Sequence, residues 1–431
     1  MQNNNRFDLS EYLLHFFRDI NQLSDNAIEL PEDMGAHSIH EIDEDNPVVS
    51  AGFFLRAALQ NGRLWATWSK RNAVRTVYGP RPAVCFTEMP IAALLEAGEA
   101  RRDRGEAMSP FALAFPKKAL HKEGARPVIY GLSSYATLPN GKGGGPRLLP
   151  ESALPLNEQY RFVSQYYGRE KTIDWTHERE WRWPYAGRPR KVKVVAGCEL
   201  PPKKWSDIPG FDFYKACIMG IGVILETDEQ AKQVISTMLT LVDRHVAIEK
   251  TFGFVLVRDR LPSITGLQDP AQLAEKIEGS KVNLKPYLSV PAAKTRRLHK
   301  RFTSLVQQVE DDAKNFKGHV WPTLGGCWLW LLDNTAELTR ALVASGRVHV
   351  TTDGRYLASL DEFSEDRSRD ERQEMAVRLA ELVQETFNTP SCYFSVRDSD
   401  DPEVADNFTD AGPGDSEFFN CSWDYKRRQD S

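Results

Sequence analysis

Apolar residues in the first half of the chain occur in short runs separated by turn signals. Four of them at helical spacing predict an amphipathic helix: Phe53, Phe54, Ala57 and Ala58. Asn61-Gly62 would end this helix, because glycine readily adopts the left-handed backbone of a helix C-terminus. Runs rich in β-branched and aromatic residues predict strands at 82–87, 111–115 and 127–130.

The second half carries clearer helix signals. A buried strand at 216–225 leads into a helix whose start is marked by Thr227 and Gln230, which match a capping box. Further elements are a strand at 252–257, an apolar run at 325–331, a helix at 335–345, a hairpin turning at Asp353-Gly354, a long helix at 368–387 and a strand at 393–396.

These patterns predict an α+β protein with two folded parts. We expect a first domain over 1–265, with a mixed β core and helices, and a basic helical linker over 266–320. A smaller α+β domain over 321–431 would serve recognition or regulation. It contains an acidic segment, 398–417, that has no Lys or Arg and is expected to be solvated or to bind a partner.

Composition narrows the class of protein. The 55 Lys and Arg residues against 60 Asp and Glu residues leave a net charge of -5, so no overall field attracts nucleic acid. Six scattered cysteines without a CxxC pair are typical of a reducing compartment. Neither a signal peptide nor an apolar run of membrane-spanning length is recognisable. We therefore expect a cytoplasmic protein that does not enter a membrane.

The clearest indication of a catalytic site is the segment 176–183, with the sequence THEREWRW. In an extended strand, Glu178, Glu180 and Arg182 would share one face, while three other residues would share the opposite face: Arg179, Trp181 and Trp183. The two carboxylates would then stand roughly 6 to 7 Å apart. The ordinary interpretation is a surface strand with solvated charges, but the apolar face is heavy enough to hold the strand in a core.

Paired carboxylates beside a cation are typical of glycosidic bond cleavage through an oxocarbenium-like transition state. The loss of nicotinamide from NAD is one such cleavage. A carboxylate aimed at the ribose stabilises the positive charge that develops on it. A second carboxylate can orient or deprotonate the acceptor. Neither role requires a metal.

Several motifs add a family resemblance over roughly the first 225 residues. They are LLHFF at 13–17, VCFTEMP at 84–90, FALAFPK at 111–117 followed by 127–130, and EREWRW at 178–183. Together they resemble the AbiGi-type abortive-infection proteins and, more remotely, ADP-ribosyltransferase toxins of the DarT kind. The chain departs from that pattern at Phe17, where a Thr or Ser is common, and in an acidic insertion over 32–46.

The resemblance implies an NAD-dependent ADP-ribosyltransferase, a toxin or effector of anti-phage defence. Its catalytic glutamate would be Glu180, with Glu178 as its partner and Arg182 beside them. The NAD-binding residues would be His15, Phe16, Arg18, Phe86, Thr87 and Tyr130, with His15 holding the adenosine ribose. The acceptor would be a macromolecule, either nucleic acid or protein. An activity of this kind also implies a neutralising partner protein.

The sequence leaves alternatives open for the conformation around His15 and for the function. Leu13, Phe17 and Ile20 also fit a helical stripe, so the segment around His15 is either a strand or a helix. The site could be degenerate, which would make the chain a non-catalytic sensor or an antitoxin-like binding protein. The third possible function is that of a metal-dependent nuclease. The motif His37-x-x-His40-Glu41 could place two imidazoles on one side of a helical turn, but no third ligand lies in evident register. No metal site is therefore expected.

The densest basic cluster is Lys-Thr-Arg-Arg-Leu-His-Lys-Arg at 294–301, in an expected helix. Such a cluster can follow a phosphate backbone. The favoured interpretation is an exposed face whose charge is balanced by acids further along the same helix, at Glu310, Asp311 and Asp312.

Overall fold

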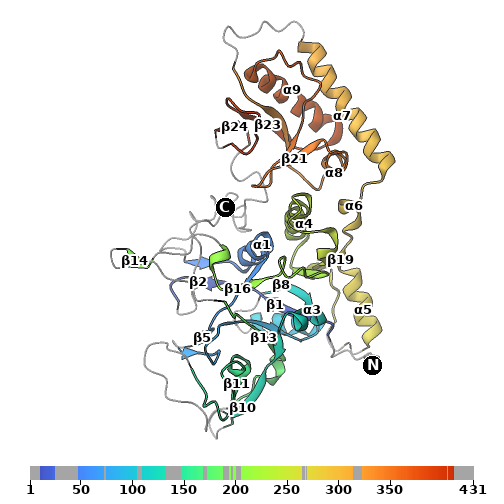
Figure 1. Cartoon of the computed structure of the whole chain (residues 1–431). Coiled ribbons are helices and arrows are strands. Elements are labelled where there is room, and N and C mark those ends of the chain that lie inside the picture. Colours follow the sequence, from blue (N-terminus) through green and yellow to red (C-terminus); the bar gives the residue numbers. More distant parts are fainter. Residues whose placement is uncertain are drawn as a thin grey trace. The chain divides into compact units, whose positions relative to one another are not determined.

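The computed structural model describes residues 10–24, 47–71, 74–103, 109–132, 147–167, 172–187, 194–195, 198–199, 205–264, 267, 269–313, 323–404 and 406–411. Helices and strands are interspersed along the chain, which is an α+β protein (Figure 1). Contacts divide it into two compact units. Unit 1 takes its described residues from Met1–Ala231 and Lys250–Val282, and unit 2 from Lys232–Glu249 and Asn283–Asn420. The boundary falls inside helix α4 (Asp228–Asp243).

Unit 1 is built on an eight-stranded sheet in the order β19-β18-β17-β8-β1-β7-β13-β9. All neighbouring strands are antiparallel except β17 and β18. The strands are β1 (Tyr12–Phe16), β7 (Ala83–Thr87), β8 (Ala112–Pro116), β9 (Arg126–Pro127), β13 (Glu180–Pro184), β17 (Ile221–Leu225), β18 (Phe252–Val257) and β19 (Lys281–Val282).

The other helices and strands of unit 1 lie between the strands of this sheet in chain order. The helices are α1 (Ala51–Asn61), α2 (Ile91–Asp103), α3 (Lys117–Lys122) and α5 (Pro270–Gly279). The remaining strands are β2 (Ile20–Asn21), β3 (Val48–Val49), β4 (Arg63–Trp65), β5 (Lys70–Arg71), β6 (Val74–Arg75), β10 (Ile129–Leu132), β11 (Phe162–Tyr167), β12 (Thr172–Ile173), β14 (Val194–Val195), β15 (Cys198–Glu199) and β16 (Gly210–Asp212). Strands β10, β11 and β12 form a three-stranded sheet.

Strands β8 and β17 near the middle of the large sheet are apolar on both faces, as buried central strands require. One face carries Leu14 and Ala114 and packs against Leu94 and Leu95 of α2. The other face carries Phe86 and Phe115, whose rings meet edge to face with centroids 5.9 Å apart. Because both faces are covered in this part of the sheet, strands β1, β7 and β8 are held rigidly.

Unit 2 is a five-stranded antiparallel sheet with helices, in the order β21-β22-β20-β23-β24. Its strands are β20 (Cys327–Leu331), β21 (Val348–Val350), β22 (Tyr356–Ala358), β23 (Ser391–Val396) and β24 (Asn407–Thr409). Its helices are α6 (Lys285–Leu288), α7 (Ala292–Asp312), α8 (Glu337–Ala344) and α9 (Arg369–Phe387). Strand β24 lies within the acidic segment 398–417, so part of that segment is an edge strand.

Alternation along β20 assigns its side chains to two clusters. Leu329 and Leu331 pack with residues of α7, α8 and α9, whereas Trp330 packs on the other face with Phe394. Trp330 is 4% exposed and is therefore a core residue.

Local signals predicted several element ends correctly. Gly62 ends α1 with φ 61° and ψ 27°, as glycine permits. Ser368 and Glu371 form a capping box at the start of α9, and the backbone N–H of Gln230 donates to the Thr227 hydroxyl over 3.3 Å. The turn at Asp353-Gly354 joins the antiparallel pair β21 and β22.

Two strand predictions were wrong in extent. The strand expected at 127–130 is split into β9, which pairs with β13, and β10, which pairs with β11 in a different sheet. The strand expected at 216–225 begins only at Ile221, because Cys217 and Gly220 have φ values of 52° and 78° and form a turn.

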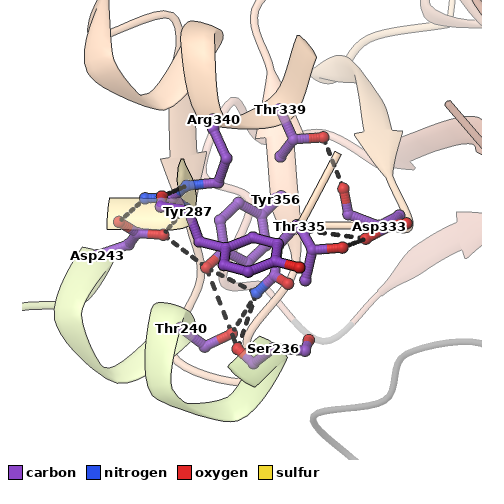
Figure 2. Close-up of polar contacts among 10 residues, drawn as sticks. Ser236, Thr240, Asp243, Tyr287, Asp333, Thr335, Thr339, Arg340 and Tyr356 are labelled. Atoms are coloured by element: carbon purple, nitrogen blue, oxygen red, sulfur yellow. Dashed lines mark hydrogen bonds and ion pairs between the residues drawn. The ribbon is translucent and has the colours of Figure 1, made fainter. Parts of the chain in front are cut away.

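A largely buried polar network in unit 2 joins α4 to α8 and β22 (Figure 2). Arg340 of α8 donates to both carboxylate oxygens of Asp243, over 2.5 and 3.0 Å, and its Nε donates to the carbonyl of Tyr287. The hydroxyl of Tyr356 donates to the same carboxylate over 2.7 Å. Asn334 completes the network by donating to the Tyr356 hydroxyl and to Thr240 Oγ1, each over 3.0 Å. The second half of α4 is thereby part of the unit 2 core.

None of the helices described here has the length and apolar character that crossing a membrane would require.

Candidate functional site

Three of the segments that carry sequence motifs are neighbouring strands of the large sheet. Strand β7 from VCFTEMP lies between β1 from LLHFF and β13 from EREWRW. Thr87 pairs with Leu14 on one side and with Glu180 on the other. Directly opposite residues of antiparallel strands project to the same face. Leu14, Thr87 and Glu180 therefore form a row across one face of the sheet.

Glu180 and Arg182 form a close ion pair on this face. Arg182 donates from Nε to Oε1 of Glu180 over 2.7 Å and from Nη2 to Oε2 over 3.2 Å. Its Nη1 donates to the carbonyls of Tyr160 and Phe162 over 2.7 and 3.3 Å. Burial opposes the charge on Arg182, but the carboxylate of Glu180 outweighs it and raises the pKa of the guanidinium.

Two neighbours complete the surroundings of the pair. The hydroxyl of Tyr130 accepts a hydrogen bond from the backbone N–H of Glu180 over 3.1 Å, and burial raises the pKa of this hydroxyl. Cys85 pairs with Arg182 across the strands. Burial, together with the Glu180 carboxylate, raises the pKa of the Cys85 thiol to about 12. The thiol is therefore inert as a nucleophile.

Glu178 does not share a strand with Glu180, so the expected strand through both residues is wrong. Thr176–Glu178 is a single 3-10 turn, and Arg179 after it has φ 45° and ψ 47°. Asp174 starts this turn by accepting from the backbone N–H and the hydroxyl of Thr176 over 2.9 and 2.7 Å. Strand β13 begins only at Glu180. The Glu178 carboxylate instead lies 3.5 Å from Nε2 of His177.

Thr87 secures the position of this turn. Its buried hydroxyl donates to the carbonyl of Glu178 over 2.6 Å and accepts from the N–H of Met89 over 3.0 Å. A hydroxyl with both functions occupied has a positioning role toward Glu178. Thr87 was predicted to contact NAD, and the structure instead gives its side chain these two protein partners.

His15 lies on a strand, which decides between the two predicted conformations. It follows Leu14 in β1, so its side chain projects to the opposite face from Leu14, Thr87 and Glu180. There the ring of His15 lies edge to face with that of Phe86, with centroids 5.8 Å apart. The sequence prediction placed His15 and Glu180 in one site, and the alternation of β1 separates them.

The imidazole of His15 bonds to the backbone of β7. Its Nδ1 lies 2.9 Å from the carbonyl oxygen of Cys85, which only accepts, so Nδ1 carries the proton in this network. Burial lowers the pKa of His15 to about 4, and the hydrogen bond to Cys85 offsets only part of this effect. His15 is therefore neutral near pH 7.

The other predicted NAD-binding residues lie in different surroundings. Phe16 alternates with His15 and so projects to the Leu14 face, where it packs against the cluster that contains Leu14. Arg18 is exposed beyond the end of β1. Phe86 is 2% exposed and belongs to the core on the His15 face.

Sequence reasoning gave no role to Glu88, which follows Thr87. Its Oε1 accepts from Nζ of Lys117 over 2.9 Å, and its Oε2 accepts from the indole N–H of Trp181 over 2.7 Å. Glu88 thus ties β13 to α3. The only local signal for this role is the acid within VCFTEMP, and the partners come from distant segments.

No group of three or more His, Cys, Asp or Glu side chains suitable for a metal occurs among the described residues. His37, His40 and Glu41 lie outside those residues.

Comparison with known proteins concerns mainly unit 2. Residues 290–421 match the family model described as a protein of unknown function, DUF4427. The match begins just before α7 and leaves out β1, β7 and β13. No curated protein and no solved structure matches the chain.

Proposed function

We propose that unit 1 is an NAD-dependent ADP-ribosyltransferase domain acting as an effector of anti-phage defence in the cytoplasm. The observation that carries this proposal is the register of Leu14, Thr87 and Glu180 across β1, β7 and β13. Three motifs distant in sequence, which together resemble transferase toxins, lie on adjacent strands, and this pairing brings Glu180 beside Thr87 and Leu14 on one face. The proposed site lies on the Glu180 face of the sheet.

In the proposed reaction, the bond between the nicotinamide nitrogen and ribose C1′ of NAD breaks. Nicotinamide leaves with the bonding electrons, and the acceptor nucleophile bonds to C1′ and releases its proton. Glu180 stabilises the positive charge that develops on the ribose and accepts a hydrogen bond from a ribose hydroxyl. Glu178 orients the acceptor or removes its proton. The acceptor is a macromolecule, either nucleic acid or protein.

The surrounding residues have positioning roles in this proposal. Arg182 fixes the orientation of the Glu180 carboxylate by holding both oxygens. Thr87 holds the Glu178 turn, and Tyr130 holds the backbone of Glu180. Among the residues first predicted to bind NAD, Phe16 is retained because it projects to the Glu180 face, and exposed Arg18 is retained as a phosphate contact. His15 and Phe86 support β7 from the opposite face.

Nicotinamide release tests the proposal without knowledge of the acceptor. The full chain is incubated with NAD and cell extract, and free nicotinamide is measured together with labelled ADP-ribose on macromolecules. Glu180→Gln is expected to lower release by about 10²- to 10³-fold, the usual effect of removing a group that stabilises transition-state charge. Glu180→Asp keeps the negative charge and moves the carboxylate by one methylene, so the same loss is expected in a folded protein.

Glu158→Gln is the matched control, because Glu158 forms a partly exposed ion pair with Arg161 in the same unit. It is expected to retain full release. The proposal would be abandoned if the folded wild-type chain released no nicotinamide with any extract. It would also be abandoned if both Glu180 variants kept wild-type activity.

The second candidate function is a non-catalytic NAD sensor or an antitoxin-like binding protein of a defence system. The observation that favours it is the engagement of both Glu180 oxygens by Arg182, which is itself 4% exposed. A sensor would bind NAD in calorimetry and release no nicotinamide. A neutralising partner protein belongs to the transferase proposal, and coexpression that relieves growth arrest would identify it.

A further inference from the structure

The first half of α7 presents basic side chains to solvent. Arg296, Arg297, Lys300 and Arg301 are all exposed. At 100° per residue they occupy one side of the helix, and the apolar residues that hold the helix in unit 2 occupy the other. These are Leu298, Phe302, Val306 and Val309. We refer to the four exposed cations as the α7 basic face. Because Phe302 and Val306 are fully buried, this face is held rigidly.

The charge of this face is not neutralised by ion pairs among the described residues. There, Arg296, Arg297 and Lys300 form no ion pair, and Arg301 lies over the ring of Phe387 at 5.2 Å. The neighbouring Lys294 does pair with an acid, Glu337, over 2.5 Å.

The acids that were expected to balance the basic face do not do so. Glu310 is buried, and it accepts from Arg367 over 3.2 Å and from the N–H of Ser364 over 3.3 Å. Asp311 and Asp312 are ten or more residues beyond Arg301, about 15 Å along the axis at 1.5 Å per residue. That separation exceeds the Debye length of about 8 Å at physiological ionic strength.

Helix stability does not account for the position of the cations. They lie in the second and third turns of α7, whereas the helix dipole acts mainly on the first turn, so the dipole does not favour cations there. Pro291 precedes the helix and offers no side-chain cap. Neither capping nor the dipole therefore explains the position of the cations.

The rest of the exposed side of α7 is polar and largely uncharged. Ser304, Gln307 and Gln308 continue the line of the basic face and are all exposed. Such side chains donate hydrogen bonds to phosphate oxygens. No large apolar residue interrupts this side of the helix, so it lacks the buried apolar stripe by which amphipathic helices enter a membrane surface.

We propose that the α7 basic face docks the phosphodiester backbone of a nucleic acid without reading its sequence. The proposal does not rest on the transferase function of unit 1. The chain as a whole carries a net charge of -5, so attraction to a polyanion must come from a local surface of this kind. Four cations on one rigid helix face supply about four phosphate contacts.

The test uses the full chain and short fluorescent DNA duplex, single-stranded DNA and RNA duplex. Affinity is measured by anisotropy between about 0.05 and 0.2 M salt, where four phosphate contacts correspond to a slope of about -3.6 for log affinity against log salt on a duplex. The variant Arg296→Gln, Arg297→Gln, Lys300→Gln is expected to reduce the magnitude of this slope by about 2.7. The loss is expected with DNA and RNA alike, and the tighter binder identifies the source.

The matched control removes three exposed lysines of unit 1, with Lys118→Gln, Lys122→Gln and Lys250→Gln. It changes the net charge equally and is expected to leave the slope unchanged. Glutamine has nearly the same helix propensity as arginine and lysine, so circular dichroism should show an intact helix in the α7 variant.

Three outcomes would overturn the proposal. The wild-type chain binds no nucleic acid at low salt, the control triple variant loses as much affinity as the α7 variant, or polyglutamate competes as well as DNA does. The last result would assign the face to an acidic protein. None of these measurements depends on NAD, so failure here leaves the transferase proposal separately testable.

Discussion

Arg182 holds both carboxylate oxygens of Glu180, with Nε–Oε1 and Nη2–Oε2 distances of 2.7 and 3.2 Å. The two residues are two positions apart in β13 and so project to the same face of the sheet. The guanidinium is buried and also bonds the carbonyls of Tyr160 and Phe162. One arginine therefore links the carboxylate with the backbone of a neighbouring segment.

Breaking this pair is expected to destabilise unit 1. Glu180→Gln leaves the guanidinium of Arg182 buried without its counter-charge, which costs about 3 kcal/mol by analogy with other buried pairs. Urea unfolding followed by circular dichroism measures the change. Glu158→Gln, in the more exposed pair with Arg161, should cost less than about 1 kcal/mol. Equal effects of the two variants would show that the Arg182 pair does not support the fold.

His15 is expected to make stability depend on pH. Its folded pKa of about 4 lies below the ordinary value of 6.5, so below pH 6.5 the unfolded chain binds a proton that the folded chain does not. This contribution to stability is complete above pH 6.5 and is lost as the pH falls toward 4. At pH 4.5 the loss is about 2–3 kcal/mol, from 1.36 kcal/mol per pKa unit.

The comparison of wild type with His15→Asn isolates this effect from the carboxylates. Asparagine retains an N–H near the place of Nδ1 and does not titrate. Urea unfolding at pH 7.5 and 4.5 should show a smaller loss of stability in the variant. Parallel losses in the two proteins would mean that the pKa of His15 is not lowered in the folded chain.

The Asp243–Arg340 pair is expected to hold α4 to the core of unit 2 (Figure 2). Asp243→Asn leaves Arg340 buried and uncompensated, at a cost of about 3–5 kcal/mol. Amide hydrogen exchange in α8 and β22 should therefore accelerate by about a hundredfold or more. Tyr356→Phe removes one hydroxyl from the network and should cost about 1–2 kcal/mol.

A surface pair provides the control for this experiment. Arg378 and Glu381 are both more than half exposed, at 60% and 58% of their side chains, so Arg378→Gln should leave exchange in α8 unchanged. Wild-type exchange rates in Asp243→Asn would contradict the assigned role. The residues matched to the DUF4427 family begin at 290, so Asp243 is a core contribution from outside the matched region.

Local signals explain why part of the fold was predictable. The helix caps at Thr227 and Ser368 and the turn at Asp353-Gly354 form hydrogen bonds with backbone groups only a few residues away. Such features can therefore be predicted from neighbouring residues in the sequence. The failed prediction at Glu178 is instructive for the same reason. The hydrogen bond that Thr176 donates to Asp174 is also local, but the alternation of charges and tryptophans suggested a longer strand.

The pairing of distant segments was harder to predict from the sequence. The resemblance of the motifs suggested that β1, β7 and β13 belong together, but not which face each side chain would take. A strand alternates with period 2, so a single position decides whether His15 projects toward Glu180 or away from it. The Cys85 carbonyl and the Leu14–Thr87 register settle that position, and both depend on a residue about seventy positions away.

The sequence by itself determined the α+β class, several element ends and the residues that carry charge, because caps, turns and hydrophobic periods act over a few residues. Only the tertiary structure decided that Arg182 engages Glu180, that His15 supports β7 from the opposite face, and that three cations of the α7 basic face form no ion pair with any residue that the structure describes. These outcomes depend on strand register and on which charges meet across the fold. Both arise from the packing of whole elements, which local patterns do not specify.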